Sequence, residues 1–281
     1  MVPMWILKYL PNMIAAHISL MQGAKGPNNT ITTACAAGTQ AVGEAFRLIQ
    51  RGDADYVLAG GADSRIDPLL MLAYSSLGAL SPARRDPLEV SRPFDAERDG
   101  FVLGEGAGVL VLEDFEHAKQ RGARIYAEVL GLGSSFDAYA ITKPDPEAGG
   151  AVRAIQWALR EARLNPSDIN YVNAHGTSTR LNDLMETMAI KRVFGDDAKG
   201  LPLSRSTRPS VTLSATWIMS PTAPGICPSG ARYPQVSVSA VKTPHWSCPA
   251  WPLERQIRTS VKAEFSRSLS LRQNRRKHLL Q

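Results

Sequence analysis

The first 200 residues alternate between short continuous runs of apolar residues and longer segments in which apolar residues recur every three or four positions. A short run bounded by Gly, Pro or Asn is typical of a buried strand, and the longer spacing is typical of a helix with one apolar face. Strands that alternate with helices indicate a mainly parallel sheet covered on both faces, so the fold class is α/β. We therefore predict strands at 31–34, 56–59, 101–113, 125–132 and 169–173, and helices at 36–50, 68–77, 114–120, 148–164 and 182–194.

Local signals set several limits of these elements. Asp67 is an N-cap residue and Pro68 suits the first helical position, so together they place the start of the second helix. Gly60 and Gly61 are expected to end the strand at 56–59. The helix at 148–164 is expected to turn one apolar face toward the sheet, formed by Val152, Ile155, Trp157, Ala158 and Ala162.

Both periodicities fade after Gly200, where prolines become frequent, and we place a domain boundary there. Residues 201–281 hold 12 Lys and Arg against Glu254 and Glu264 only, so the basic balance of the whole chain, +6, comes from this tail. The tail is expected to be poorly ordered. Its charges are scattered without an aromatic repeat or a known module, so binding to nucleic acid is a weak alternative and is not our expectation.

The remaining composition excludes several classes of protein. With 281 residues, 44% hydrophobic residues and a mean hydropathy of −0.16, the chain suits a globular domain. Three cysteines cannot form a disulfide framework, which favours a reducing cytoplasm. The apolar stretch at 1–21 is interrupted by prolines and polar residues, so we predict neither a membrane span nor a signal peptide.

Cys35 lies where the first predicted strand turns into a helix, among small residues that leave the sulfur accessible. Unpaired backbone N–H groups and the helix dipole favour a negative charge there, and the thiolate is the nucleophilic form of cysteine. The alternative is a small buried residue without a chemical role.

His175 directly follows the predicted strand at 169–173, and Gly176 allows a sharp turn before three hydroxyl residues. Polar groups at the carboxyl end of a strand often line a site, although a loop histidine with a satisfied hydrogen bond is the alternative. The glycine-rich run at 104–108 lacks the pattern of a phosphate-binding loop, so close backbone packing explains it better. The other histidines and cysteines lack metal-ligand spacing, and we predict no metal site.

Several runs, taken together and in this order, resemble the β-ketoacyl-acyl carrier protein synthases of the elongating type II. The resemblance covers about residues 5 to 200. The runs are TTACAAGT (32–39), AGGAD (59–63), SRPFD (91–95), RDGFVLGEGAG (98–108), DAY (137–139) and NAHGTST (173–179).

The resemblance implies the thiolase-like layered αβαβα fold and a homodimer. It implies an acyltransferase of fatty acid biosynthesis that condenses an acyl thioester with malonyl on acyl carrier protein and releases carbon dioxide. Cys35 would accept the acyl chain, and His175 would stabilise the negative charge that develops on the malonyl thioester oxygen. Thr177 and Thr179 would bind the phosphopantetheine arm, which arrives on the carrier, so no cofactor of the enzyme's own is expected.

By the same resemblance, Arg84 and Arg85 would offer positive charge to the acidic carrier, and Asp183 and Glu186 are acidic positions beside the site. The chain departs from the family pattern at both ends. The region that normally precedes residue 5 is absent, and a lysine segment, a second catalytic histidine and a glycine-rich loop are not found after Gly200. The alternatives are therefore a non-catalytic remnant that binds acyl carrier protein or a partner subunit, and a thiolase-like acyltransferase.

Overall fold

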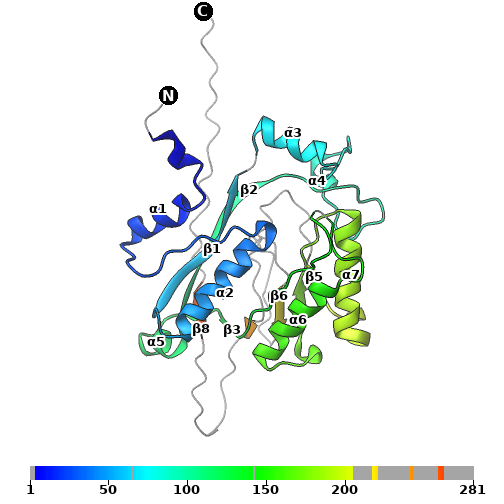
Figure 1. The fold of residues 1–281 in the computed structure, drawn as a ribbon. Helices are drawn as coiled ribbons and strands as arrows, with labels where there is room; N and C mark the ends of the chain where they lie inside the picture. The colour runs from blue at the N-terminus through cyan, green and yellow to red at the C-terminus, as the bar shows by residue number, and fades with distance from the viewer. Residues whose placement is uncertain are drawn as a thin grey trace, which may run out of the picture.

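The computed structural model describes residues 4–64, 66–141, 143–204, 217–220, 241–242 and 259–262 (Figure 1). The helices are α1 Met13–Gln22, α2 Ala37–Gln50, α3 Pro68–Ser76, α4 Pro87–Val90, α5 Phe115–Gln120, α6 Gly149–Ala162 and α7 Arg180–Phe194, with the 3-10 turns η1 Trp5–Lys8, η2 Ala34–Ala36, η3 Pro166–Asp168 and η4 Gly195–Lys199. The strands are β1 Tyr56–Ser64, β2 Glu105–Asp114, β3 Ala127–Val129, β4 Tyr171–Asn173, β5 Leu203–Ser204, β6 Trp217–Ser220, β7 Val241–Lys242 and β8 Thr259–Lys262.

The strands form one sheet in the order β1-β2-β8-β3-β7-β6-β4-β5. Helices and sheet together confirm the α/β class. The prediction of a mainly parallel sheet is wrong, because within the described residues only β4 with β5 and β6 with β7 run parallel. The connection from β1 to β2 carries α3 and α4 but returns the chain as an antiparallel neighbour, and β8 joins β2 and β3 in the antiparallel sense.

The prediction of a strand at 31–34 is also wrong, because residues 31–33 have no regular structure and Ala34 begins η2. Ala34 has a φ of +51°, which extended backbone cannot have. The segment also has no place in the sheet, whose edge on that side is β1.

Gly60 and Gly61, which we expected to end the strand at 56–59, lie inside β1 instead. Gly60 is paired with Val109 of β2, and a Cβ atom at Gly60 would overlap the carbonyl oxygen of Gly108. The glycines of β1 and of the run at 104–108 therefore allow the two backbones to approach closely. This confirms the packing explanation for that run.

We expect Gly60→Ala to lower the free energy of unfolding by about 3 kcal/mol, because the new methyl group must push two paired strands apart. Urea denaturation followed by circular dichroism measures this. Gly26→Ala is the matched control, since a Cβ atom there meets nothing within 4 Å. A loss at Gly60 no larger than that of the control would contradict this account of the β1–β2 contact.

The core consists of two groups of buried side chains. In the first, α2 packs on β1 and β2, with Phe46 (1% exposed) and Leu112 (0%) at its centre. In the second, α6 and α7 pack around Val172 of β4. The helix predicted at 148–164 does bury Val152, but Trp157 is 51% exposed, so its assignment to the apolar face is wrong. Trp157 lies two positions after Ile155, on another side of the helix.

In the tail, β5 to β8 add short strands that the sequence did not predict. Their pairing comes from neighbours distant in the chain, such as Thr259 opposite Asp114, and not from a local periodicity. The remainder of the tail lies outside the described residues, so its expected lack of order and the boundary near Gly200 stay predictions.

Candidate active site

Cys35 lies in the turn η2, one residue before Ala36, the N-cap of α2, and its side chain is exposed. The thiol therefore sits at the N-terminal end of a 14-residue helix, where the dipole favours a negative charge. Ala34, the residue before it, is in the left-handed region, which costs a non-glycine residue roughly 1–3 kcal/mol.

A short chain of side-chain hydrogen bonds holds this turn. The Thr33 hydroxyl donates to Oε1 of Gln40 on the first turn of α2, and Nε2 of Gln40 donates to Oγ of Ser134 at 3.0 Å. Gln40 thus links the turn that carries Cys35 to the loop after β3. No feature of the sequence pointed to Gln40.

The loop that follows β4 carries His175, and the buried carboxylate of Glu186 on α7 holds its backbone. Oε1 of Glu186 accepts the N–H of His175 at 2.6 Å, and Oε2 accepts the N–H of Gly176 at 2.9 Å. Gly176 has a φ of +48°, which confirms the predicted sharp turn. The buried Nδ1 of His175 has no hydrogen-bond partner among the described residues.

Thr177 and Thr179 lie on the same turn, and their hydroxyl oxygens are 2.8 Å apart. Thr179 is the N-cap of α7, because its hydroxyl also accepts the N–H of Asn182 at 3.4 Å. The structure thus brings both predicted arm-binding hydroxyls next to His175 and gives Thr179 a structural role as well.

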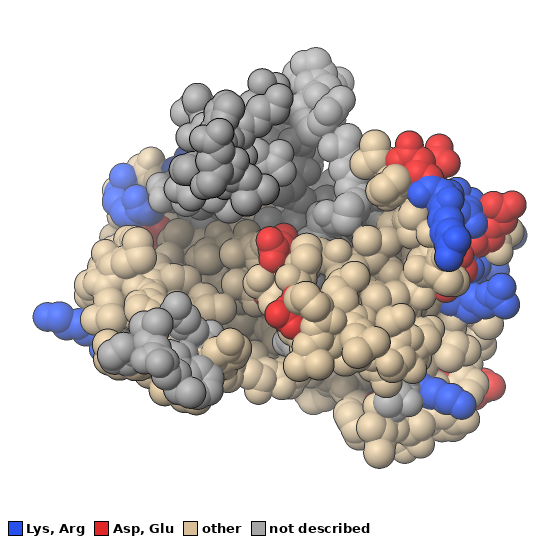
Figure 2. Space-filling view, turned by 90° about the horizontal axis from the view of Figure 1, so that it is seen from above, with Lys and Arg blue, Asp and Glu red and all other residues tan. Residues whose placement is uncertain are grey.

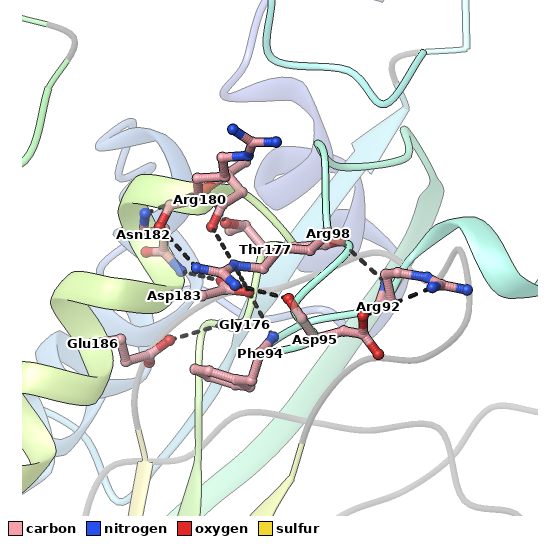
Figure 3. Close-up of polar contacts among 12 residues, drawn as sticks. Arg92, Phe94, Asp95, Arg98, Gly176, Thr177, Arg180, Asn182, Asp183 and Glu186 are labelled. Carbon is pink, nitrogen blue, oxygen red and sulfur yellow. Dashed lines mark hydrogen bonds and ion pairs between the residues drawn. The ribbon is translucent and has the colours of Figure 1, made fainter. Parts of the chain in front are cut away.

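Asp183, on the first turn of α7, is 1% exposed and tightly held (Figure 3). Its Oδ2 accepts the N–H of Phe94 at 2.8 Å and lies 3.4 Å from Nε of Arg98, and its Oδ1 accepts from Nδ2 of Asn182. Ser178, fully buried, accepts the N–H of Arg92 on its hydroxyl at 3.1 Å and the N–H of Gly100 on its carbonyl. The segment 91–100 is therefore fastened along the loop of His175.

Charged side chains of both signs surround Arg85 on the adjoining surface. Nη1 of Arg85 lies 3.4 Å from Oε2 of Glu97, and Nη1 of Arg92 lies 2.9 Å from the same oxygen. Arg84 is exposed beside them. Figure 2 shows such charges gathered at one end of the upper face, on the side of α4 and α7, while most of the rest of that face is uncharged.

The two candidate groups come from different parts of the sheet. Cys35 precedes α2, which packs on β1 and β2, whereas His175 follows β4 near the other edge. The starts of α2 and α7 both lie toward the upper end of the molecule in Figure 1. Within the described ranges no three His, Cys, Asp or Glu side chains are grouped as metal ligands, and no helix has the length and apolar character that a membrane crossing needs.

Comparison with known proteins decides the family. The model of the β-ketoacyl synthase N-terminal domain matches residues 2–118, and the model of the β-ketoacyl synthase C-terminal domain matches residues 126–211. The chain belongs to the β-ketoacyl synthase family. The resemblance inferred from the runs at 32–39 and 173–179 is confirmed.

Curated relatives within the β-ketoacyl synthase family are close in sequence but longer. The 3-oxoacyl-[acyl-carrier-protein] synthase 2 of Synechocystis is 50% identical over 202 residues, which cover 72% of this chain and 49% of that protein. The mitochondrial 3-oxoacyl-[acyl-carrier-protein] synthase of Arabidopsis thaliana is 50% identical over 211 residues, which cover 75% of this chain and 46% of that protein. The chain spans about half the length of the curated relatives it matches.

Solved β-ketoacyl synthase structures share the fold. A type II polyketide ketosynthase, solved with its acyl-carrier protein and bound to a hexaketide, is 42% identical with a TM-score of 0.67, covering 68% of this chain and 47% of that chain. A β-ketoacyl synthase from Burkholderia phymatum is 42% identical with a TM-score of 0.66, covering 70% of this chain and 47% of that chain.

Two of the polar residues that hold the β-ketoacyl synthase loops together, Arg98 and Ser178, were given no role by sequence reasoning, unlike Asp183 and Glu186. Arg98 and Ser178 belong to the runs that carry the resemblance, but nothing in those runs assigns them a partner. Their partners lie more than 80 positions away, as in the pairs Arg98 with Thr179 and Arg92 with Ser178. The roles predicted for Cys35 and His175 in catalysis stay predictions.

Proposed function

We propose that this chain is an acyltransferase that catalyses a decarboxylative condensation between an acyl thioester and malonyl on acyl carrier protein. The observation that supports this most strongly is the exposed Cys35 thiol, held on a strained turn at the N-terminal end of α2. The relatives named 3-oxoacyl-[acyl-carrier-protein] synthase support the same reaction in fatty acid biosynthesis.

In the first step, the Cys35 thiolate attacks the carbonyl carbon of the acyl thioester. A bond forms between Sγ and this carbon, the bond to the sulfur of the carrier arm breaks, and the carrier thiolate leaves and takes up a proton. Thr177 and Thr179 hold the arm through their hydroxyls. The phosphopantetheine arm is part of the substrate, and the proposal includes no cofactor bound by the chain itself.

In the second step, the bond between the malonyl carboxylate and its α-carbon breaks and carbon dioxide leaves. The electron pair stays on the malonyl unit as an enolate, whose oxygen His175 stabilises by a hydrogen bond. The α-carbon then attacks the acyl carbonyl on Cys35. A carbon–carbon bond forms, the bond to Sγ breaks, and the thiolate is restored.

Carbon dioxide release tests this proposal. The purified chain is incubated with malonyl-acyl carrier protein labelled at the free carboxylate, with and without acyl-acyl carrier protein, and the released label is counted. We expect release above the buffer rate, with β-ketoacyl-acyl carrier protein found by mass spectrometry. Binding of the carrier without any release would favour the non-catalytic alternative.

Arg84 and Arg85 are proposed to guide the acidic carrier to the site. Because contacts of exposed charges act mainly on encounter, we expect Arg84→Ala with Arg85→Ala to raise KM for the carrier about 10-fold at low salt and to leave kcat unchanged. Steady-state kinetics at two salt concentrations measures this. Arg51→Ala, an exposed arginine paired with Asp53, is the control. An equal rise in the control, or no salt dependence, would contradict the docking role.

A homodimer is also part of the proposal. Neither α1 nor α3 buries a residue, and both expose large apolar side chains, including Leu20 (77%), Leu69 (73%) and Leu72 (64%). Apolar surface of this kind is typical of an interface between subunits. Light scattering that finds only the mass of one chain would contradict the dimer.

A cytoplasmic location is also part of the proposal, and the low cysteine content supports it.

A further inference from the structure

Arg98 makes four contacts, three of which join the segment 91–100 to the start of α7. Nε donates to the carbonyl of Thr179 at 3.3 Å, and Nη2 donates to the carbonyl of Arg180 at 3.1 Å. Nη1 donates to the carbonyl of Asp95 at 2.7 Å, within its own segment. Nε also lies 3.4 Å from Oδ2 of Asp183 (Figure 3). The side chain is only 19% exposed.

The place of this guanidinium is unfavourable for the helix itself. Arg98 puts a positive charge at the N-terminal end of α7, where the helix dipole is also positive. The carboxylate of Asp183 offsets this, because an acidic residue in the first turn is favourable there. The stability of α7 therefore does not explain why an arginine lies at this position. The hydrogen bonds of Arg98 to three backbone carbonyls explain it.

The two segments that Arg98 joins are held in uncommon backbone conformations. Phe94 has a φ of +64° and Ser178 has a φ of +66°, so two non-glycine residues in the left-handed region lie in facing loops. Such residues persist only where their surroundings fix them. The turn that contains Ser178 also carries His175, whose backbone N–H is bonded to Glu186 three residues after Asp183.

We propose that Arg98 is a positioning residue, which locks the turn 175–180 against the segment 91–100 and so fixes His175 for its step. This rests on the proposed function, because it concerns the histidine of the decarboxylation. Arg98 does not contact substrate in this account. It acts on His175 indirectly, because it binds the backbone carbonyls of Thr179 and Arg180 on the same turn.

The variant Arg98→Met keeps a side chain of similar length and removes every donor. The fold should tolerate it, because Asp183 keeps the N–H of Phe94 and Nδ2 of Asn182 as donors. We expect kcat for carbon dioxide release from malonyl-acyl carrier protein to fall about 10- to 100-fold, KM to stay within about twofold, and alkylation of Cys35 by iodoacetamide to stay within about twofold. Arg98→Lys, which keeps the charge beside Asp183, should lose less.

The control variant is Arg121→Met. Arg121 also binds a buried carboxylate, that of Glu113, at 2.6 and 2.5 Å, but it is the C-cap of α5, an element that contributes no residue to the candidate site. The Arg121 guanidinium lowers the pKa of Glu113, so this contact is also an ion pair between an arginine and a buried carboxylate. We expect carbon dioxide release to stay within about twofold of the wild type.

A His175→Ala background separates positioning from general stability. If Arg98 acts through His175, then Arg98→Met should change the residual rate of that background less than about twofold. An equal 10- to 100-fold loss in that background, or the same loss in Arg121→Met, would overturn the proposal.

Amide hydrogen exchange measures the same role without activity. We expect exchange at residues 175–180 to become about tenfold faster in Arg98→Met, with no change in β1 and β2. Unchanged exchange at 175–180 would overturn the positioning role. If the wild-type chain releases no carbon dioxide, the proposed function fails, and the exchange experiment still decides the role of Arg98.

Discussion

Replacing Cys35 with Ala should abolish transfer of an acyl chain to the protein and lower formation of β-ketoacyl product by at least about 1,000-fold, because the proposed acyl thioester forms on the Cys35 sulfur. The side chain is exposed on η2 and contributes nothing to either core group, so the fold should persist. Incubation with labelled acyl-acyl carrier protein, followed by gel separation and counting, measures the transfer.

The controls are Cys227→Ala and Cys248→Ala, which remove the two other thiols of the chain. Both should transfer acyl chains at the wild-type rate. Acylation that survives Cys35→Ala, or that disappears in one of the controls, would assign the nucleophile elsewhere.

Replacing His175 with Ala should lower carbon dioxide release from malonyl-acyl carrier protein about 100-fold, since the enolate oxygen loses its hydrogen-bond donor. Acylation of Cys35 should stay within about threefold. The two rates are measured separately, one by labelled carbon dioxide and one by labelled acyl chain. This separation follows from the different elements that carry the two residues, η2 and the loop after β4.

His117→Ala is the matched control, because His117 is half-exposed on α5 and binds Glu113, outside the candidate site. Its carbon dioxide release should equal that of the wild type. If His175→Ala slows both steps equally, His175 does not act in decarboxylation alone, and the mechanism given for the second step is wrong.

Elements with local signals were predictable from the sequence. Asp67 accepts the N–H of Leu69 and Pro68 opens α3, as the N-cap and proline signals indicate. α2 ends at Gln50 and α7 ends at Phe194, at the predicted limits. Such signals depend on residues a few positions apart, so one sequence is enough to interpret them.

Features set by distant residues were not predictable in this way. Gly60 lies inside β1 because Gly108, 48 positions later, approaches its backbone. The antiparallel direction of β2 and the pairing of β8 depend on the path of long connections. The contact of Arg98 with Asp183 joins the run at 98–108 to an acidic position that the family resemblance named separately, and only the folded chain brings them together.

The residues of the candidate site were found through motifs rather than periodicity. The run at 173–179 placed His175, Thr177 and Thr179 on one turn, as the structure has them. The geometry that holds the turn depends on Glu186 and on the segment 91–100, and no pattern in the sequence states those contacts.

The central claim is that Cys35 is an activated nucleophile that accepts an acyl chain. The most direct measurement incubates the purified chain with acyl-acyl carrier protein, or with the cysteine-directed inhibitor cerulenin, and locates the adduct by peptide mass spectrometry. The account predicts an adduct on Cys35 that forms at least about tenfold faster than on Cys227 or Cys248. Equal rates at the three cysteines, or no adduct on Cys35, would contradict it.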